Sequence, residues 1–140
     1  MTVGLLVITH NRIGEELLST VLGTLGICPL CTETMAVSTR DDPDWMRVRA
    51  RRILEELDQG DGVLVLTDIF GSTPSNIAYG LLDSPRVRVV SGVNLPMLLR
   101  VLNYPQLSLN ELAEKALSGG RDGIIDCCPQ EQHPPPQSPS

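Results

Sequence analysis

The chain has 140 residues, of which 41% are hydrophobic and 20% charged, a balance typical of one globular domain with a single core. Its formal net charge is −6 and Lys115 is its only lysine, so binding to a nucleic-acid backbone or an anionic membrane surface is not expected. No apolar run approaches the roughly 18 residues of a transmembrane helix. The first positive charge is Arg12, so no secretory signal is indicated, and we expect a cytoplasmic protein.

Apolar strands alternate with amphipathic helices in the first half of the chain. Residues 3–8 are continuously apolar, which is typical of a strand covered on both faces. Residues 13–25 carry an apolar stripe at helical spacing, and a second strand is predicted over residues 32–37. Asp44 is predicted to cap a helix that ends near Leu57. Most of the apolar face of that helix is assigned to Trp45, Val48, Ile53, Leu54 and Leu57.

The second half continues this alternation. A third strand is predicted over residues 62–68, and a helix from Thr73, as N-cap, to about Leu82 because Pro74 suits the first helical position. A fourth strand is predicted over residues 86–92, followed by a short helix that starts at Asn94 and Pro96.

The last elements are a helix, a short strand and a tail. Ser108 and Glu111 form a capping-box pattern, and Gly119 with Gly120 is predicted to end that helix. A final strand is predicted over residues 123–126. Residues 127–140 are rich in proline and polar residues, and we expect them to form a disordered tail outside a domain of residues 1–126.

This order of elements predicts an α/β fold with an open, mainly parallel sheet and helices on both faces. In such sheets, ligands bind at the carboxyl ends of the strands, where the strand order reverses. With the order 2-1-3-4, that crevice lies between the first and third strands.

Two titratable residues end those two strands, His10 and Asp68. Each precedes a helix N-terminus, whose free N–H groups favour an anion such as phosphate. A neutral imidazole nitrogen can attack phosphorus while its other nitrogen donates to a carboxylate, and the hydroxyls of Ser72 and Thr73 are candidates to hold the phosphoryl oxygens. The alternative is a polar histidine satisfied at a strand end. No glycine-rich nucleotide-binding motif is present.

The cysteines do not indicate a metal or cofactor. Cys28 and Cys31 form a C-x-x-C pattern, but a thioredoxin-like pair opens a helix, whereas here a strand follows. Cys127 and Cys128 are adjacent and are interpreted as small fillers or surface thiols. His133 lies in the tail, where no role is expected for it, so few candidates for a zinc site remain and neither a metal nor a cofactor is expected.

Three motifs in this order resemble one family: an apolar strand ending in Thr-His before a helix, then TDIFGSTPSN, then GVNLPML. Together they are similar to the IIA domain of the mannose family in the bacterial phosphoenolpyruvate-dependent sugar phosphotransferase system. The resemblance covers about residues 1–126 and implies that His10 is phosphorylated and that Asp68 orients it. It also implies that Thr73 and Asn94 lie beside the pocket.

The sequence departs from the family pattern at two places. Asn11 replaces a glycine that often follows the histidine, and Ser72 replaces the second glycine of the central motif. Asn tolerates left-handed backbone, so we expect the turn to survive and assign Asn11 and Ser72 to the phosphate-binding residues with Thr73 and Asn94. Arg12 either neutralises a phosphoryl group or is a solvated residue, and the second interpretation is favoured.

The resemblance also implies partners. The phosphoryl donor would be phospho-HPr and the acceptor a IIB component, with at most peripheral association with membrane subunits and no nucleic acid. The family exchanges its final strand between two subunits, which implies a homodimer here through residues 123–126.

Other functions stay open at this stage. One is a stand-alone regulatory phosphocarrier not coupled to transport; another is the phosphotransferase subunit of the dihydroxyacetone kinase system. From other classes come a receiver-like domain phosphorylated on Asp68 and a thiol-disulfide protein built on Cys28 and Cys31. The sequence does not identify a sugar.

Overall fold

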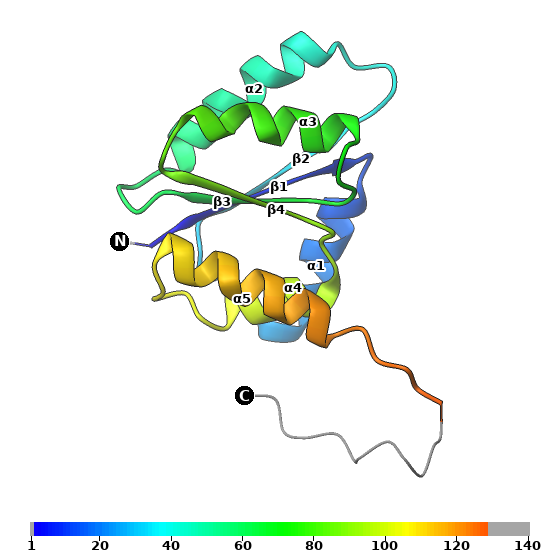
Figure 1. The fold of residues 1–140 in the computed structure, drawn as a ribbon. Coiled ribbons are helices and arrows are strands. Elements are labelled where there is room, and N and C mark those ends of the chain that lie inside the picture. Colours follow the sequence, from blue (N-terminus) through cyan, green and yellow to red (C-terminus); the bar gives the residue numbers. More distant parts are fainter. Residues whose placement is uncertain (1, 129–140) are drawn as a thin grey trace.

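Four parallel strands form one open sheet. The computed structural model describes residues 2–128. The strands are β1 (Gly4–His10), β2 (Thr32–Val37), β3 (Val63–Thr67) and β4 (Val87–Ser91), in the order β2-β1-β3-β4 (Figure 1). All three pairings are parallel, which confirms the predicted fold class and strand order.

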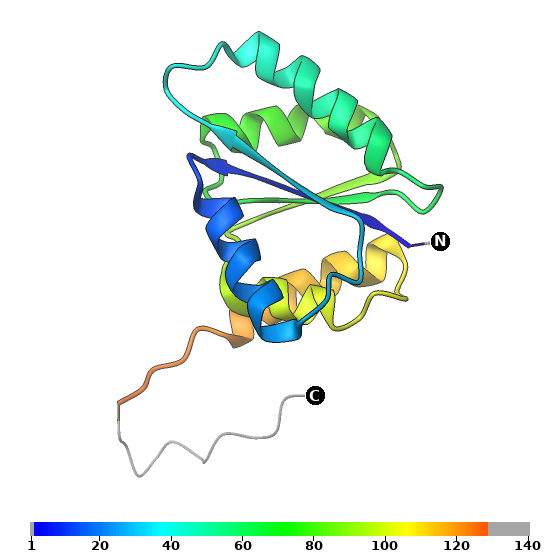
Figure 2. The same ribbon diagram turned by 180° about the vertical axis from the view of Figure 1, so that it is seen from behind.

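The helices form one layer on each side of this sheet. On one side lie α2 (Pro43–Leu57), α3 (Thr73–Tyr79) and a 3-10 turn, η1 (Gly80–Asp83). On the other lie α1 (Ile13–Leu25), α4 (Leu95–Leu102) and α5 (Leu109–Asp122), as Figures 1 and 2 show from opposite sides. Within residues 2–128, no helix is both long and apolar enough to cross a membrane.

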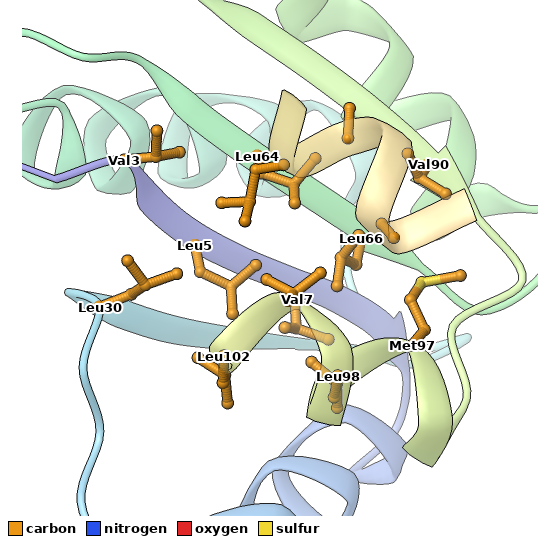
Figure 3. Close-up of a cluster of buried hydrophobic side chains, with 14 of the residues drawn as sticks. Val3, Leu5, Val7, Leu30, Leu64, Leu66, Val90, Met97, Leu98 and Leu102 are labelled. Carbon is orange, nitrogen blue, oxygen red and sulfur yellow. The ribbon is translucent and has the colours of Figure 1, made fainter. Parts of the chain in front are cut away.

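The central strands explain why the sequence shows continuous apolar runs. Alternate residues of β1 and β3 face opposite layers, and both layers are covered. Leu5, Val7, Leu64 and Leu66 pack with α4 and α5 in one cluster (Figure 3). The other cluster, against α2 and α3, contains Leu6, Ile8, Val63 and Val65.

Helix α2 buries a different face from the predicted one. Its N-cap is Asp42, whose side chain accepts from the Asp44 N–H, two residues before the predicted cap. Trp45 and Val48 are exposed rather than buried. The sheet instead contacts a stripe that includes two residues outside the predicted face, and its buried members are Met46, Ala50, Leu54 and Leu57.

Two further helix boundaries differ from prediction. The N-cap of α3 is Ser72 rather than Thr73, and the α-helix ends at Tyr79 before η1 continues to Asp83. Helix α5 runs through Gly119 and Gly120 to Asp122. A Cβ on Gly119 would lie 2.8 Å from the Arg100 Cβ, so these glycines let α5 pack closely against α4 instead of ending the helix.

The predicted final strand is absent from the described chain. Residues 124–128 have no regular structure, and Ile124 and Ile125 are exposed. Among the described residues, this segment is not part of the sheet, whose edge strands are β2 and β4. His133 and the rest of residues 129–140 lie outside the described residues. For them, the disordered tail stays a prediction.

Candidate active site

His10 and Asp68 meet at the carboxyl edge of the sheet. The ring Nδ1 of His10 lies 2.8 Å from Asp68 Oδ2, and the backbone N–H of His10 donates to the same oxygen at 2.9 Å. Because an ionised carboxylate only accepts, Nδ1 carries the hydrogen and the lone pair of the neutral ring is on Nε2. The His10 side chain is 39% exposed, whereas that of Asp68 is 9% exposed.

The carboxylate of Asp68 is held in its ionised form. Burial raises the pKa of this carboxyl, but the hydrogen bonds from the backbone and ring of His10 outweigh burial and lower the pKa below its ordinary value. The N–H of Ile69 donates to the other oxygen, Oδ1, at 3.0 Å. An ionised Asp68 therefore fixes the tautomer of His10 and stabilises a positive charge on its ring.

The turn after His10 survives the replacement of glycine. Asn11 adopts φ +49°, in the left-handed region, and its N–H donates to the Val37 carbonyl at 2.8 Å. Thr9, which is buried, accepts from the N–H of Gly14 in the first turn of α1 at 2.8 Å. Sequence reasoning missed this role of Thr9, although a hydroxyl residue just before a helix start is its signal.

The loop after Asp68 presents hydroxyl and apolar groups beside the pair. Ser72 donates through Oγ to the Ile69 carbonyl at 2.6 Å and does not cap α3 with its side chain. Thr73 is exposed, and no hydrogen bond of its hydroxyl is found among residues 2–128. Ile69 and Phe70 are exposed as well, so the loop presents two large apolar side chains to solvent.

Asn94 caps α4 at this edge of the sheet and also binds α5. Its Oδ1 accepts from the Met97 N–H at 2.9 Å and caps α4, and its Nδ2 donates to the Gly120 carbonyl of α5 at 3.2 Å. The side chain therefore links two helices. The sequence analysis predicted that Asn94 starts α4 and lies beside the pocket, but it did not predict the bond to Gly120.

Arg12 points along α1. Its Nε lies 2.8 Å from Glu15 Oε2, and Nη2 lies 3.7 Å from Glu16 Oε1. The Arg12 side chain is 75% exposed, consistent with the favoured interpretation of a solvated residue in the first turn.

The four cysteines are all exposed. The Cys28 Sγ contacts the Leu30 carbonyl and the Thr32 hydroxyl, at the entry to β2 rather than at a helix start. Across residues 2–128, no three His, Cys, Asp or Glu side chains are grouped as a metal site would require.

By its fold and site, the molecule is an open α/β domain with a histidine–carboxylate pair at its strand ends. Comparisons with known proteins identify its family. A model of the phosphotransferase system (PTS) fructose IIA component matches residues 4–117. The chain is 31% identical over 132 residues to the "PTS system mannose-specific EIIAB component" of Escherichia coli K12, covering 89% of this chain and 39% of that protein. It is 36% identical over 77 residues to the "PTS system fructose-specific EIIA component" of Bacillus subtilis, covering 52% of this chain and 53% of that protein.

Solved structures agree with this match. The mannose/sorbose-specific IIA subunit from Enterococcus faecalis superposes with a TM-score of 0.80 at 27% identity, covering 90% of this chain and 95% of that one. The chain therefore belongs to the mannose-type EIIA family of the sugar phosphotransferase system. Its membership supports a phosphotransferase role in general and confirms the resemblance read from the three motifs.

Proposed function

We propose that the chain carries a phosphoryl group on His10, taken in the cytoplasm from phospho-HPr and passed to a IIB component in sugar uptake. The observation that carries this proposal is the 2.8 Å contact between Nδ1 of His10 and the ionised Asp68. It leaves Nε2 as the nucleophilic nitrogen, and no described residue of the chain is hydrogen-bonded to it.

The transfer needs only one bond to form and one to break. The Nε2 lone pair attacks phosphorus, and the bond between phosphorus and HPr breaks with its electron pair returning to HPr. The hydrogen on Nδ1 stays in its bond to Asp68, whose negative charge offsets the positive charge that develops on the ring. The same steps in the opposite sense deliver the phosphoryl group to IIB.

Backbone and hydroxyl groups around the pair are suited to hold the phosphoryl oxygens. We assign this task to Asn11, Ser72 and Thr73, because Asn11 forms the turn after His10 and the other two begin α3 near Asp68. The hydroxyl of Thr73 needs to break no internal hydrogen bond to do so. Asn94 would contribute by positioning its loop, since both polar atoms of its amide bind helices.

Other functions read from the sequence have less support. In a receiver-like domain Asp68 would accept the phosphoryl group, but its Oδ2 already accepts two hydrogen bonds from His10. The dihydroxyacetone kinase subunit and a regulatory carrier use the same histidine chemistry, and their distinction depends on the acceptor protein. The family match favours the sugar system.

We also propose that the protein is a homodimer. Ile124 and Ile125 are 79% and 70% exposed, and β4 is an edge strand with no partner on one side within residues 2–128. The free edge of β4 could pair with the apolar segment of a second copy, since that segment forms no strand within the described residues of its own chain. Residues 123–126 of one subunit would then extend the sheet of the other.

Phosphorylation from phosphoenolpyruvate through enzyme I and HPr tests the proposed function. One acid-labile phosphoryl group per chain is expected, and none for His10→Ala, whereas His133→Ala is expected to keep the full label. A label that survives acid but is removed by hydroxylamine would identify an acyl phosphate and transfer the acceptor role to Asp68.

A further inference from the structure

The solvent face of α2 carries apolar and cationic side chains together. Trp45 is 56% exposed and Val48 53% exposed. At helical spacing, Arg49 and Arg52 follow these two residues by four positions and lie beside them on the side opposite the buried stripe. We call this set, Trp45, Val48, Arg49 and Arg52, the outer face of α2.

The arginines of this helix are of two kinds. Arg47 is paired with Asp44 at 2.8 Å, and Arg51 with Asp83 at 3.1 Å. Among residues 2–128, no carboxylate lies within 4.0 Å of the side chain of Arg49 or Arg52. Two unpaired cations on one helix face stand out in a chain whose formal net charge is −6.

The same helix borders a shallow hollow of about 390 Å³. It is lined by the apolar Val48, by Arg52, by the paired Arg47 and Arg51, and by Glu55. One apolar residue among three arginines is suited to one apolar side chain carried by an acidic segment.

We propose that the outer face of α2 is a docking surface for an acidic segment of a partner protein, with at least one large apolar side chain that packs against Val48 and Trp45. Charge complementarity identifies the occupant: the free cations of Arg49 and Arg52 meet its carboxylates. A flat anionic bilayer or a nucleic acid would bring a wide negative surface against a chain of net charge −6, whereas a narrow segment meets only this helix.

This surface is separate from the phosphoryl site. Its residues lie on α2, in the layer that also contains α3, and none of them contacts His10 or Asp68 through a hydrogen bond or ion pair among the described residues. The proposal therefore goes beyond phosphoryl transfer. It does not depend on which residue accepts the phosphoryl group.

Trp45 is the only tryptophan of the chain, so its fluorescence reports binding at this face directly. The probe is a capped peptide of about 15 residues with glutamates and leucines at helical spacing. We expect the peptide to shift and saturate the Trp45 emission at low salt and to lose affinity as salt is raised. The same peptide with glutamine in place of every glutamate is expected to bind much more weakly.

Two charge reversals of equal size locate the site. Arg52→Glu should weaken the binding about tenfold or more, because it replaces a free cation of the outer face with a repelling carboxylate. Arg121→Glu makes the same change on α5, in the opposite layer, and is expected to leave the affinity within about twofold. Val48→Ser should also weaken binding without changing the net charge.

Each contrary result overturns the proposal. These are an unchanged Trp45 emission, equal affinity for the glutamine peptide, equal weakening by Arg121→Glu, and tighter binding to phosphatidylglycerol vesicles or duplex DNA than to the peptide. Labelling of Arg52→Glu by phospho-HPr is expected to match the unmodified protein. Loss of that label would place α2 within the HPr contact and contradict a separate partner.

Discussion

One oxygen of Asp68 accepts two hydrogen bonds from a single residue, the backbone N–H and the ring Nδ1 of His10. The carboxylate thus fixes both the end of β1 and the orientation of the ring that the strand presents. Strand position and ring chemistry are coupled through this one atom.

Replacing Asp68 by asparagine tests the charge of this pair. Asp68→Asn should fold, since an amide oxygen can still accept from the His10 backbone. Labelling by phospho-HPr should slow by a factor of about 10 to 1,000, because the ring loses the negative charge that stabilises its positive form. Initial rates of labelling measure this, with Asp83→Asn as a control that removes an exposed carboxylate elsewhere. An unchanged rate for Asp68→Asn would refute the polarising role.

The proposed exchange of residues 123–126 predicts a mass of two chains in solution. Ile124→Lys with Ile125→Lys should convert the dimer to a monomer, because two charges would enter the apolar contact between copies. Light scattering at micromolar concentration measures the mass. In contrast, Ile27→Lys changes an exposed apolar residue after α1 and should leave the mass unchanged. A monomer for the unmodified chain would contradict the exchange.

Asp58 and Arg86 give the stability of the fold a defined dependence on pH. Arg86 donates to both carboxylate oxygens at 2.8 Å, and the N–H groups of Gly60 and Gly62 donate to Oδ1. The Arg86 bonds are the largest cause that lowers the pKa of Asp58, with the two glycine N–H groups adding to it and burial opposing it. A lowered carboxyl pKa stabilises the fold above the unfolded value of about 4 and loses this contribution as pH falls through the folded value.

Asp58→Asn should therefore lower the free energy of unfolding by about 1 to 3 kcal/mol at neutral pH. The loss should shrink as pH falls below about 4, because the Asp58 carboxyl is then protonated in the unfolded chain while the folded carboxylate, with its lowered pKa, is still ionised. Urea unfolding at a series of pH values measures both effects. A constant difference between the two proteins from pH 7 to pH 2 would contradict the assignment.

The sequence predicted the strands and the His10–Asp68 pair because both follow from local pattern. Continuous apolar runs mark strands buried on two faces, and parallel strands bring their carboxyl ends to one edge. The prediction for α2 was wrong because it assigned the large apolar Trp45 and Val48 to the buried face. The residues that pack against the sheet include the small Ala50 instead.

Other features depend on contacts between distant residues. Gly119 and Gly120 signal a helix end locally, but their proximity to α4 makes them packing positions. The double role of Asn94 requires the carbonyl of Gly120, which is 26 residues away in the sequence. Residues 123–126 have strand-like composition, but a strand also needs a pairing partner, and this segment pairs with neither edge strand within the described residues.

Two glycines in helices give opposite predictions for the same substitution. A Cβ at Gly23 in α1 would meet nothing within 4 Å, whereas one at Gly119 in α5 would lie 2.8 Å from the Arg100 Cβ and 3.2 Å from the Pro96 carbonyl. Alanine is favoured over glycine inside a helix by about 1 kcal/mol. Gly23→Ala should therefore raise the free energy of unfolding by about 0.5 to 1 kcal/mol.

Gly119→Ala should lower the free energy of unfolding by about 1 to 3 kcal/mol despite the better helix former, because α4 and α5 must move apart. The displacement also pulls on the bond between Asn94 and the neighbouring Gly120, so labelling of His10 should slow in Gly119→Ala and stay unchanged in Gly23→Ala. Urea unfolding and initial labelling rates of the two variants measure these effects side by side. Equal stability of Gly119→Ala and Gly23→Ala would contradict the claim that position 119 requires glycine because α4 packs closely against α5.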